Sequence, residues 1–164
     1  MHMRPGSPVS ADRLAELLRQ AVREACLLED ALERETAALG SADVNALNDA
    51  VGRKHQLAQS LERLTREQTS LLLAGGFDAD GPGMDACLKA WDSEGGLSED
   101  WSRLQQAMER CRRLNQINGG VVRTQQQQVA QAIQLLRGSD GPAELYGPQG
   151  RTVSDGFSRH FSKA

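Results

Sequence analysis

Aromatic residues are scarce in this sequence, where Phe, Trp and Tyr together make up only 4% of the chain. Leucine and alanine dominate the apolar side chains instead, and this composition suits interleaved helices. No apolar run reaches the roughly 18 residues that a membrane span requires, and the N-terminus lacks the apolar segment of a secretion signal. We therefore expect a cytoplasmic protein without membrane insertion.

Cysteine and positive charge are also limited. Cys26, Cys87 and Cys111 form no even disulfide set and have no Cys-x2-Cys spacing, which favours a reducing compartment. Cys26 and Cys111 fall in predicted helices, where a free cysteine is usually a small core residue. The net charge of -3 supplies no basic field for a nucleic acid or an acidic lipid, so we expect no nucleic-acid partner.

Motifs for catalysis and cofactor binding are missing as well. The histidines, His2, His55 and His160, are scattered and have no partner at metal-ligand spacing. The glycine-rich stretch 76–83 lacks the Lys-Ser/Thr pair of a phosphate-binding loop, and no nucleophile is placed beside a base. We therefore expect no enzyme, no cofactor and no metal site.

The dominant feature that is present is a heptad repeat between Leu97 and Gly138. Steps of three and four residues from Trp101 stay in phase over several heptads, which predicts one long helix over about residues 98–137, with Ser98 as its N-cap. Three seam positions are polar, and a buried amide there costs stability but selects register and partner. The seam consists of Trp101, Leu104, Met108, Cys111, Asn115, Asn118, Val122, Gln125, Val129, Ala132 and Leu136.

Gly119 and Gly120 lie in the middle of this predicted helix. Asn-Gly is a common turn signal, and each glycine costs a helix interior about 1 kcal/mol relative to alanine. One interpretation therefore divides the segment into a helical hairpin. We favour a continuous helix, because a turn would normally reset the heptad phase, and the glycines then mark a close backbone approach or a soft point.

Two further leucine seams predict helices over about residues 11–39 and 43–74. Gly40 is placed to stop the first helix, and the short connection that follows makes the two helices antiparallel neighbours. The candidate N-caps are Ser10 or Asp12 for the first helix and Ser41 or Asp43 for the second. Lys54 falls inside the second seam, where a lysine usually packs its stem and extends its ammonium group to solvent.

The remaining segments carry no heptad. Residues 75–97 form an acidic, Gly-rich linker, in which residues 84–91 can form a short helix that folds Leu88 and Trp91 back on the bundle. Residues 1–9 are expected to be a disordered N-terminus or an expression remnant, and residues 139–164 a flexible C-terminal tail. The predicted fold is all-α: an antiparallel three-helix, coiled-coil-like bundle over residues 10–138 with a long third helix.

Several of these features occur together in a known family. They are the joint Gly40-Ser41-Ala42-Asp43, the pattern Leu47-x3-Val51-x2-Lys54-x2-Leu57, the element Leu114-Asn115-x2-Asn118-Gly119, the pair Leu135-Leu136 and the motif Tyr146-Gly147-x2-Gly150. In this combination the chain resembles the FlgN family of flagellar type III export chaperones. The linker 77–97 is the part that departs from the family pattern.

The resemblance implies a cytosolic helical chaperone for the hook-filament junction proteins FlgK and FlgL. Such a chaperone holds the C-terminal helical region of its client, prevents early polymerisation and delivers the client to export-gate or export-ATPase components. It needs no ATP or metal of its own. An alternative from another class is a structural coiled coil that self-associates and has no client.

The residues themselves suggest where a client would bind. At 1.5 Å per residue the first two helices are roughly 45 Å long and the third is roughly 60 Å, so part of its apolar stripe is expected to lack an intramolecular partner. An amphipathic client helix could occupy that stripe, and ordinary bundle core or a homodimer seam is the alternative. Tyr146 is either a docking anchor or a tail residue folded on the bundle. The predicted partner-binding residues are Asn115, Asn118, Val122, Gln125, Val129, Ile133, Leu136 and Tyr146, in a monomer or weak homodimer.

Overall fold

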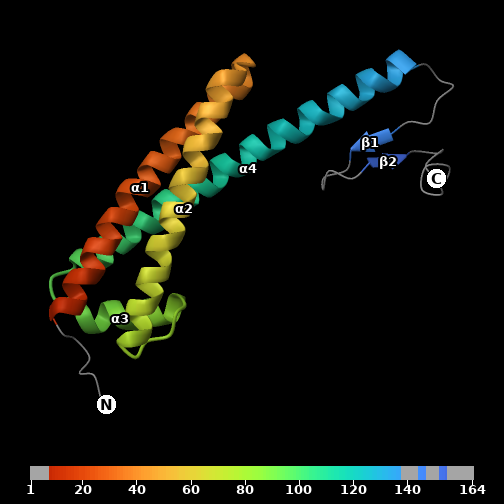
Figure 1. The fold of residues 1–164 in the computed structure, drawn as a ribbon. Helices are drawn as coiled ribbons and strands as arrows, with labels where there is room; N and C mark the ends of the chain where they lie inside the picture. The colour runs from red at the N-terminus through yellow and green to blue at the C-terminus, as the bar shows by residue number, and fades with distance from the viewer. Residues whose placement is uncertain (1–7, 138–143, 147–151, 155–164) are drawn as a thin grey trace. The chain divides into compact units, whose positions relative to one another are not determined.

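The computed structural model describes residues 8–137, 144–146 and 152–154, and these residues form four helices followed by two short strands (Figure 1). The chain divides into two compact units, Met1–Asn115 and Gln116–Ala164. The predicted all-α class is confirmed, apart from the two three-residue strands. None of the helices in the described part of the chain combines the length and the hydropathy needed to span a membrane.

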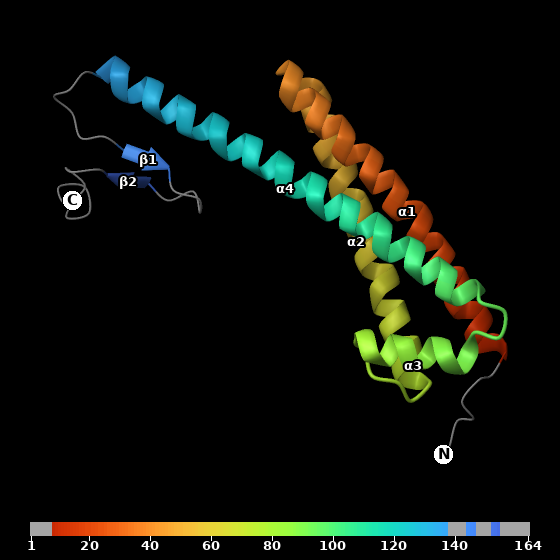
Figure 2. The same cartoon turned by 180° about the vertical axis from the view of Figure 1, so that it is seen from behind.

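Helices α1 (Pro8–Ser41) and α2 (Val44–Ala74) form an antiparallel hairpin and lie side by side in both Figure 1 and Figure 2. α1 starts earlier than expected, so neither Ser10 nor Asp12 is its N-cap, and Pro8 at its start suits a first turn that needs no amide donor. α1 also continues through Gly40. Ala42, with φ of 54°, makes the left-handed turn instead.

Asp43 caps α2, as one of the two predicted alternatives. Its Oδ1 atom accepts a hydrogen bond of 3.0 Å from the amide of Ala46, which has no carbonyl partner inside the helix. At the other end, the amide of Gly75 closes α2 on carbonyls of its last turn. Both ends of α2 therefore follow from local sequence.

The core of the first unit is built from leucine and alanine side chains of α1 and α2, joined by residues of α3 and of the first half of α4. Leu14, Leu17, Leu18, Leu32 and Leu64 are buried almost completely. Each such leucine removes enough apolar surface from water to contribute about 2–3 kcal/mol. The hairpin is thus held by the predicted seams.

The linker contains helix α3 (Gly81–Trp91), which lies across one end of the hairpin (Figure 2). It begins three residues before the predicted short helix, because Asp80 caps it through a 2.7 Å bond from the amide of Gly83 and Pro82 suits its first turn. Trp91 is buried and meets Phe77 edge to face, with ring centroids 5.5 Å apart. The predicted packing of Leu88 and Trp91 on the bundle is confirmed.

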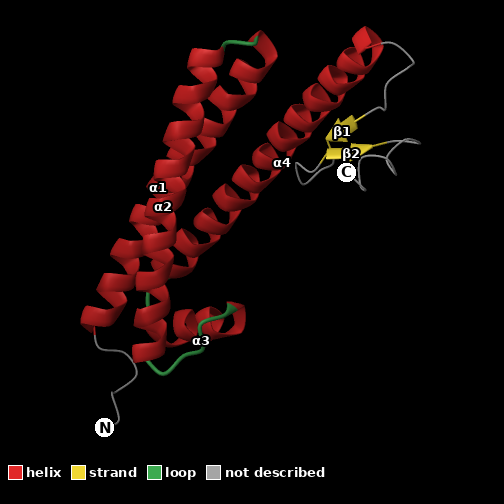
Figure 3. Cartoon of the chain, turned by 45° about the vertical axis from the view of Figure 1, so that its right-hand side comes forward, coloured by secondary structure: helices red, strands yellow, loops and turns green. Residues whose placement is uncertain are grey.

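Helix α4 (Gly96–Arg137) is one uninterrupted helix that passes through Gly119 and Gly120 (Figure 3). Ser98 is not its N-cap, because α4 begins two residues before it. Instead, the carboxylate of Asp92 accepts hydrogen bonds from the amides of Leu97 and Ser98, at 3.3 and 2.8 Å. The same residue's backbone amide closes α3 on the carbonyl of Leu88, so Asp92 joins the two helices.

The second unit also contains strands β1 (Glu144–Tyr146) and β2 (Thr152–Ser154), which pair antiparallel with Tyr146 opposite Thr152. This strand pair was not predicted from the sequence. Both segments contain residues that favour strands, and Gly147 and Pro148 after the first are common turn residues. The rest of the predicted flexible tail and residues 1–7 of the predicted N-terminal segment 1–9 lie outside the described residues. Pro8 and Val9 belong to α1, so the prediction of disorder at these two residues is wrong.

Candidate functional site

The second half of α4 exposes a row of large apolar side chains. Val122, Val129, Ile133 and Leu136 have exposed fractions of 36%, 59%, 41% and 87%. Their spacings of seven, four and three residues return to the same side of a helix, so they form one continuous stripe. We call these four residues the α4 apolar face. Contiguous exposed apolar surface makes this face the candidate contact surface of the chain.

The polar residues around this face are neutral or basic. From Arg110 to Arg137, α4 contains five arginines and no Asp or Glu, and glutamines supply most of the remaining polar side chains. Arg123 directly follows Val122 in sequence, is exposed and has no ion pair with any described residue. Arg123 therefore places an unpaired positive charge next to the face, whereas Arg110 and Arg112 are paired with Glu29 and Glu109.

A polar cluster in the first unit joins α1, α2 and α4. Lys54 Nζ lies 2.8 Å from Glu35 Oε2, and it donates a 3.4 Å hydrogen bond to Asn115 Oδ1. The expectation that Lys54 extends to solvent is therefore wrong. The carboxylate of Glu35 is buried inside the seam, and a buried charge requires a partner of opposite sign, which draws the ammonium group inward.

A pocket of about 420 Å³ opens beside this cluster, within the first unit. Its lining combines the apolar side chains of Leu28, Leu32 and Met108 with the polar side chains of His55 and Arg112. Sequence reasoning missed this pocket because its residues come from three helices, and no heptad repeat shows which of them meet.

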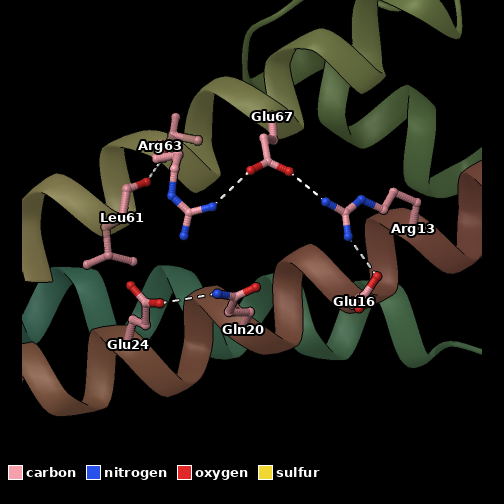
Figure 4. A network of polar contacts seen from close by, with 8 residues as sticks. Arg13, Glu16, Gln20, Glu24, Leu61, Arg63 and Glu67 are labelled. Carbon is pink, nitrogen blue, oxygen red and sulfur yellow. Dashed lines mark hydrogen bonds and ion pairs between the residues drawn. The ribbon is translucent and has the colours of Figure 1, made fainter.

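Ion pairs on the surface of the hairpin connect α1 to α2 (Figure 4). Glu67 accepts from Arg13 at 2.6 Å and from Arg63 at 3.1 Å, and Arg13 also pairs with Glu16 at 2.7 Å. The hydrogen bond to Glu16, outweighing a smaller effect of burial, raises the pKa of Arg13, so the guanidinium stays charged. Exposed ion pairs of this kind contribute about 0–1 kcal/mol each to the stability of the fold. Each of these arginines has a carboxylate partner within the hairpin.

The thiols differ in exposure. Burial raises the pKa of Cys87 to about 11, and burial together with the charge of Glu29 raises that of Cys111 to about 11. The Cys111 thiol also donates a 3.4 Å hydrogen bond to the carbonyl of Ala25. Cys26 is exposed, so its predicted place in the core is wrong. Its position falls between the buried stripe residues Ala25 and Leu28.

Comparison with known proteins relates this helical fold to one protein family. The chain matches the FlgN protein family over residues 1–154. It belongs to the FlgN family. A crystal structure from Pseudomonas aeruginosa that carries the name flagella synthesis protein FlgN resembles this FlgN family member with a TM-score of 0.61 and 25% sequence identity. The similarity covers 74% of this chain and 90% of the Pseudomonas chain, and no curated protein matches.

Membership of the FlgN family, a family of chaperones, supports a role in flagellum biogenesis. The structure separates the residues that we predicted to bind a partner. Val122, Val129, Ile133 and Leu136 form the α4 apolar face, and Gln125 is exposed within the same helix. Asn115 belongs to the cluster around Lys54, whereas Asn118 is fully buried and offers no surface to a partner.

The last predicted residue, Tyr146, lies in β1, and its side chain is outside the described part of the structure. Leu135 was not predicted as a site residue, yet it is 82% exposed. Its position one residue before Leu136 puts it off the heptad stripe, so the heptad repeat does not identify it as an exposed residue.

Proposed function

We propose that this FlgN family member is a cytoplasmic flagellar type III export chaperone whose clients are the hook-filament junction proteins FlgK and FlgL. The observation that carries the proposal is the exposure of the α4 apolar face. This face leaves part of each of four large side chains exposed to water, and a client that covers it gains about 25 cal/mol for each Å² of apolar area removed from solvent.

The proposed contact is a helix laid along a helix. An amphipathic segment with anchors at heptad spacing can place its apolar side chains between Val122, Val129, Ile133 and Leu136. The C-terminal helical region of the junction proteins is the proposed segment. While the chaperone covers this region, the client cannot polymerise through it.

The experiment that tests the proposal is co-purification of the full chain with the C-terminal segments of FlgK and FlgL. Val129→Asp and Leu136→Asp place a charge on the α4 apolar face and should abolish capture. Gln131→Asp is the matched control. Gln131 is exposed in the same helix, but it points about half a turn away from Val129 and Ile133, the face residues nearest to it in sequence. Unchanged capture by both face variants would contradict the proposed surface.

Sedimentation separates the chaperone from a structural coiled coil. A chaperone should be a monomer or a weak homodimer that binds its client with a free α4 face. A tight dimer whose association is lost in Val129→Asp would instead support a self-associating protein without a client.

Delivery forms a second part of the proposal, in which Tyr146 is a docking anchor for an export-gate or export-ATPase component. Tyrosine supplies a large amphipathic contact at low cost in conformational entropy. We expect Tyr146→Ala to retain client capture but to lose binding to the export component. Loss of both activities together would show that Tyr146 supports the client surface instead.

A further inference from the structure

The charge pattern of α4 indicates what kind of helix its apolar face accepts. Acidic residues occur throughout α1 and in α4 up to Glu109, but none follows before the helix ends at Arg137. Arg123, which directly follows Val122, is exposed and forms no ion pair with the residues that the structure describes. A partner that covers the α4 apolar face therefore meets uncompensated positive charge beside it.

The first half of α4 shows how this helix pairs with a neighbour inside the chain. Cys111 of α4 is buried against α1 through its bond to the carbonyl of Ala25. Next to this contact, Arg110 Nε donates to both carboxylate oxygens of Glu29 on α1, at 3.0 Å each. The contact thus combines a buried seam with an acid on the flank of the facing helix.

A second copy of this chain does not supply the same match. Two α4 faces brought together would place arginine-bearing flanks against each other, with no Asp or Glu between Arg110 and Arg137 to compensate. Like charges at the flanks of a helix pair oppose association, whereas opposite charges select the partner.

We propose that the α4 apolar face binds an amphipathic helix whose flanking positions carry Asp or Glu. This inference rests on the proposed function, and it specifies the chemistry of the client helix. The apolar anchors provide most of the binding energy, and the acidic flanks provide preference and salt dependence.

Three synthetic helices test the inference. They share one heptad stripe of leucine and valine and carry Glu, Gln or Lys at the positions beside the stripe. Binding of each labelled helix to the full chain is followed by fluorescence anisotropy. We expect the Glu helix to bind about tenfold more tightly than the Lys helix at about 0.05 M salt, with the difference shrinking at about 0.5 M salt.

Variants of the chain locate the effect. Arg123→Glu should reduce the preference for the Glu helix at least threefold, by an order-of-magnitude estimate from the loss of a flanking charge pair. Arg19→Glu is the matched control, because it makes the same charge change at an exposed site of α1 and should leave the preference unaltered. An equal effect of both variants would overturn the inference.

The remaining outcomes separate this inference from the proposed function. Equal affinity for all three helices, abolished by Val129→Asp, would overturn the acidic preference and leave the chaperone surface standing. Binding of none of the helices, together with unchanged capture of FlgK and FlgL segments by Val129→Asp, would overturn the docking surface itself. A dimer formed through the face would identify a second copy as the occupant and overturn the acidic partner.

Discussion

Lys54 Nζ and Glu35 Oε2 lie 2.8 Å apart between α2 and α1, where 23% of the lysine side chain and only 6% of the glutamate side chain are exposed. The same ammonium group binds Asn115 Oδ1 on α4. Three helices of the first unit therefore share one polar contact inside an otherwise apolar seam. Such a contact contributes specificity of helix register, because a slip of any helix leaves a buried charge without its partner.

Removal of the Lys54 side chain should lower the free energy of unfolding. In Lys54→Ala the carboxylate of Glu35 remains buried without an ammonium partner, so we expect a loss of about 2 kcal/mol in the free energy of unfolding. Urea denaturation followed by far-UV circular dichroism measures it. Lys89→Ala on the exposed side of α3 is the control, and we expect a change within about 0.5 kcal/mol. A loss no greater than that of the control would show that the pair has no role in stability.

Asp92 should contribute to the free energy of unfolding in a pH-dependent way. Burial acts to raise the pKa of its carboxyl group, but hydrogen bonds from Ser98 and from nearby amides outweigh burial and lower it. The stabilisation is therefore present above the ordinary carboxyl pKa and is lost as the pH falls through the lower pKa of the folded state. Asp92→Ala should cost about 1 kcal/mol at neutral pH and progressively less in acid.

The control for this prediction is Asp85→Ala, which removes an exposed carboxylate of α3. Denaturant midpoints at neutral and acidic pH, with hydrogen exchange at the amides of Leu97 and Ser98, measure the effect. A cost of Asp92→Ala that grows in acid would contradict the assigned hydrogen bonds.

Two glycine substitutions should act in opposite directions. A Cβ atom at Gly119 meets nothing within 4 Å, and the residue has no positive φ, so Gly119→Ala should stabilise α4 locally by about 1 kcal/mol. A Cβ atom at Gly83 would lie 1.9 Å from the carbonyl oxygen of Asp78, so Gly83→Ala should destabilise the first unit by about 2 kcal/mol. Hydrogen exchange around residue 119 and urea denaturation measure the two effects, and a stabilising Gly83→Ala would disprove the close approach.

A pair of leucines on α2 tests the assignment of its buried side. Leu64 is buried and Leu73 is exposed. We expect Leu64→Ala to cost about 3 kcal/mol, because it removes apolar contacts and leaves a cavity, and Leu73→Ala to cost less than about 1 kcal/mol. Thermal and urea unfolding of both variants give the comparison, and equal costs would indicate another orientation of α2.

The three thiols should differ in reactivity. Thiolates are the reactive species, and Cys87 and Cys111 are buried with pKa values of about 11, whereas Cys26 is exposed. A thiol reagent at neutral pH should therefore modify Cys26 rapidly and the other two only after unfolding. Mass spectrometry of the native and the urea-treated chain, with Cys26→Ser as the control, measures this order. Rapid native labelling of Cys111 would contradict its packing against Ala25.

Local rules account for much of the helical hairpin and for little of the connection between helices. Asp43 and Gly75 end α2 as predicted, because the chemistry of a helix terminus depends on a few adjacent residues. The start of α4 was placed wrongly, because its first amides bond to Asp92, which lies in another element. Cys26 and Lys54 were also misplaced, since their surroundings depend on neighbouring helices.

The sequence by itself determined that the chain is helical, where its long seams run and which family it belongs to, because heptad spacing and caps are local properties of the chain. Only the tertiary structure decided that Lys54 turns inward to Glu35, that Asn118 is buried, and that Val122, Val129, Ile133 and Leu136 stay exposed. A repeat shows which side of a helix is apolar, but burial depends on which neighbour covers that side, and this depends on contacts between residues distant in sequence.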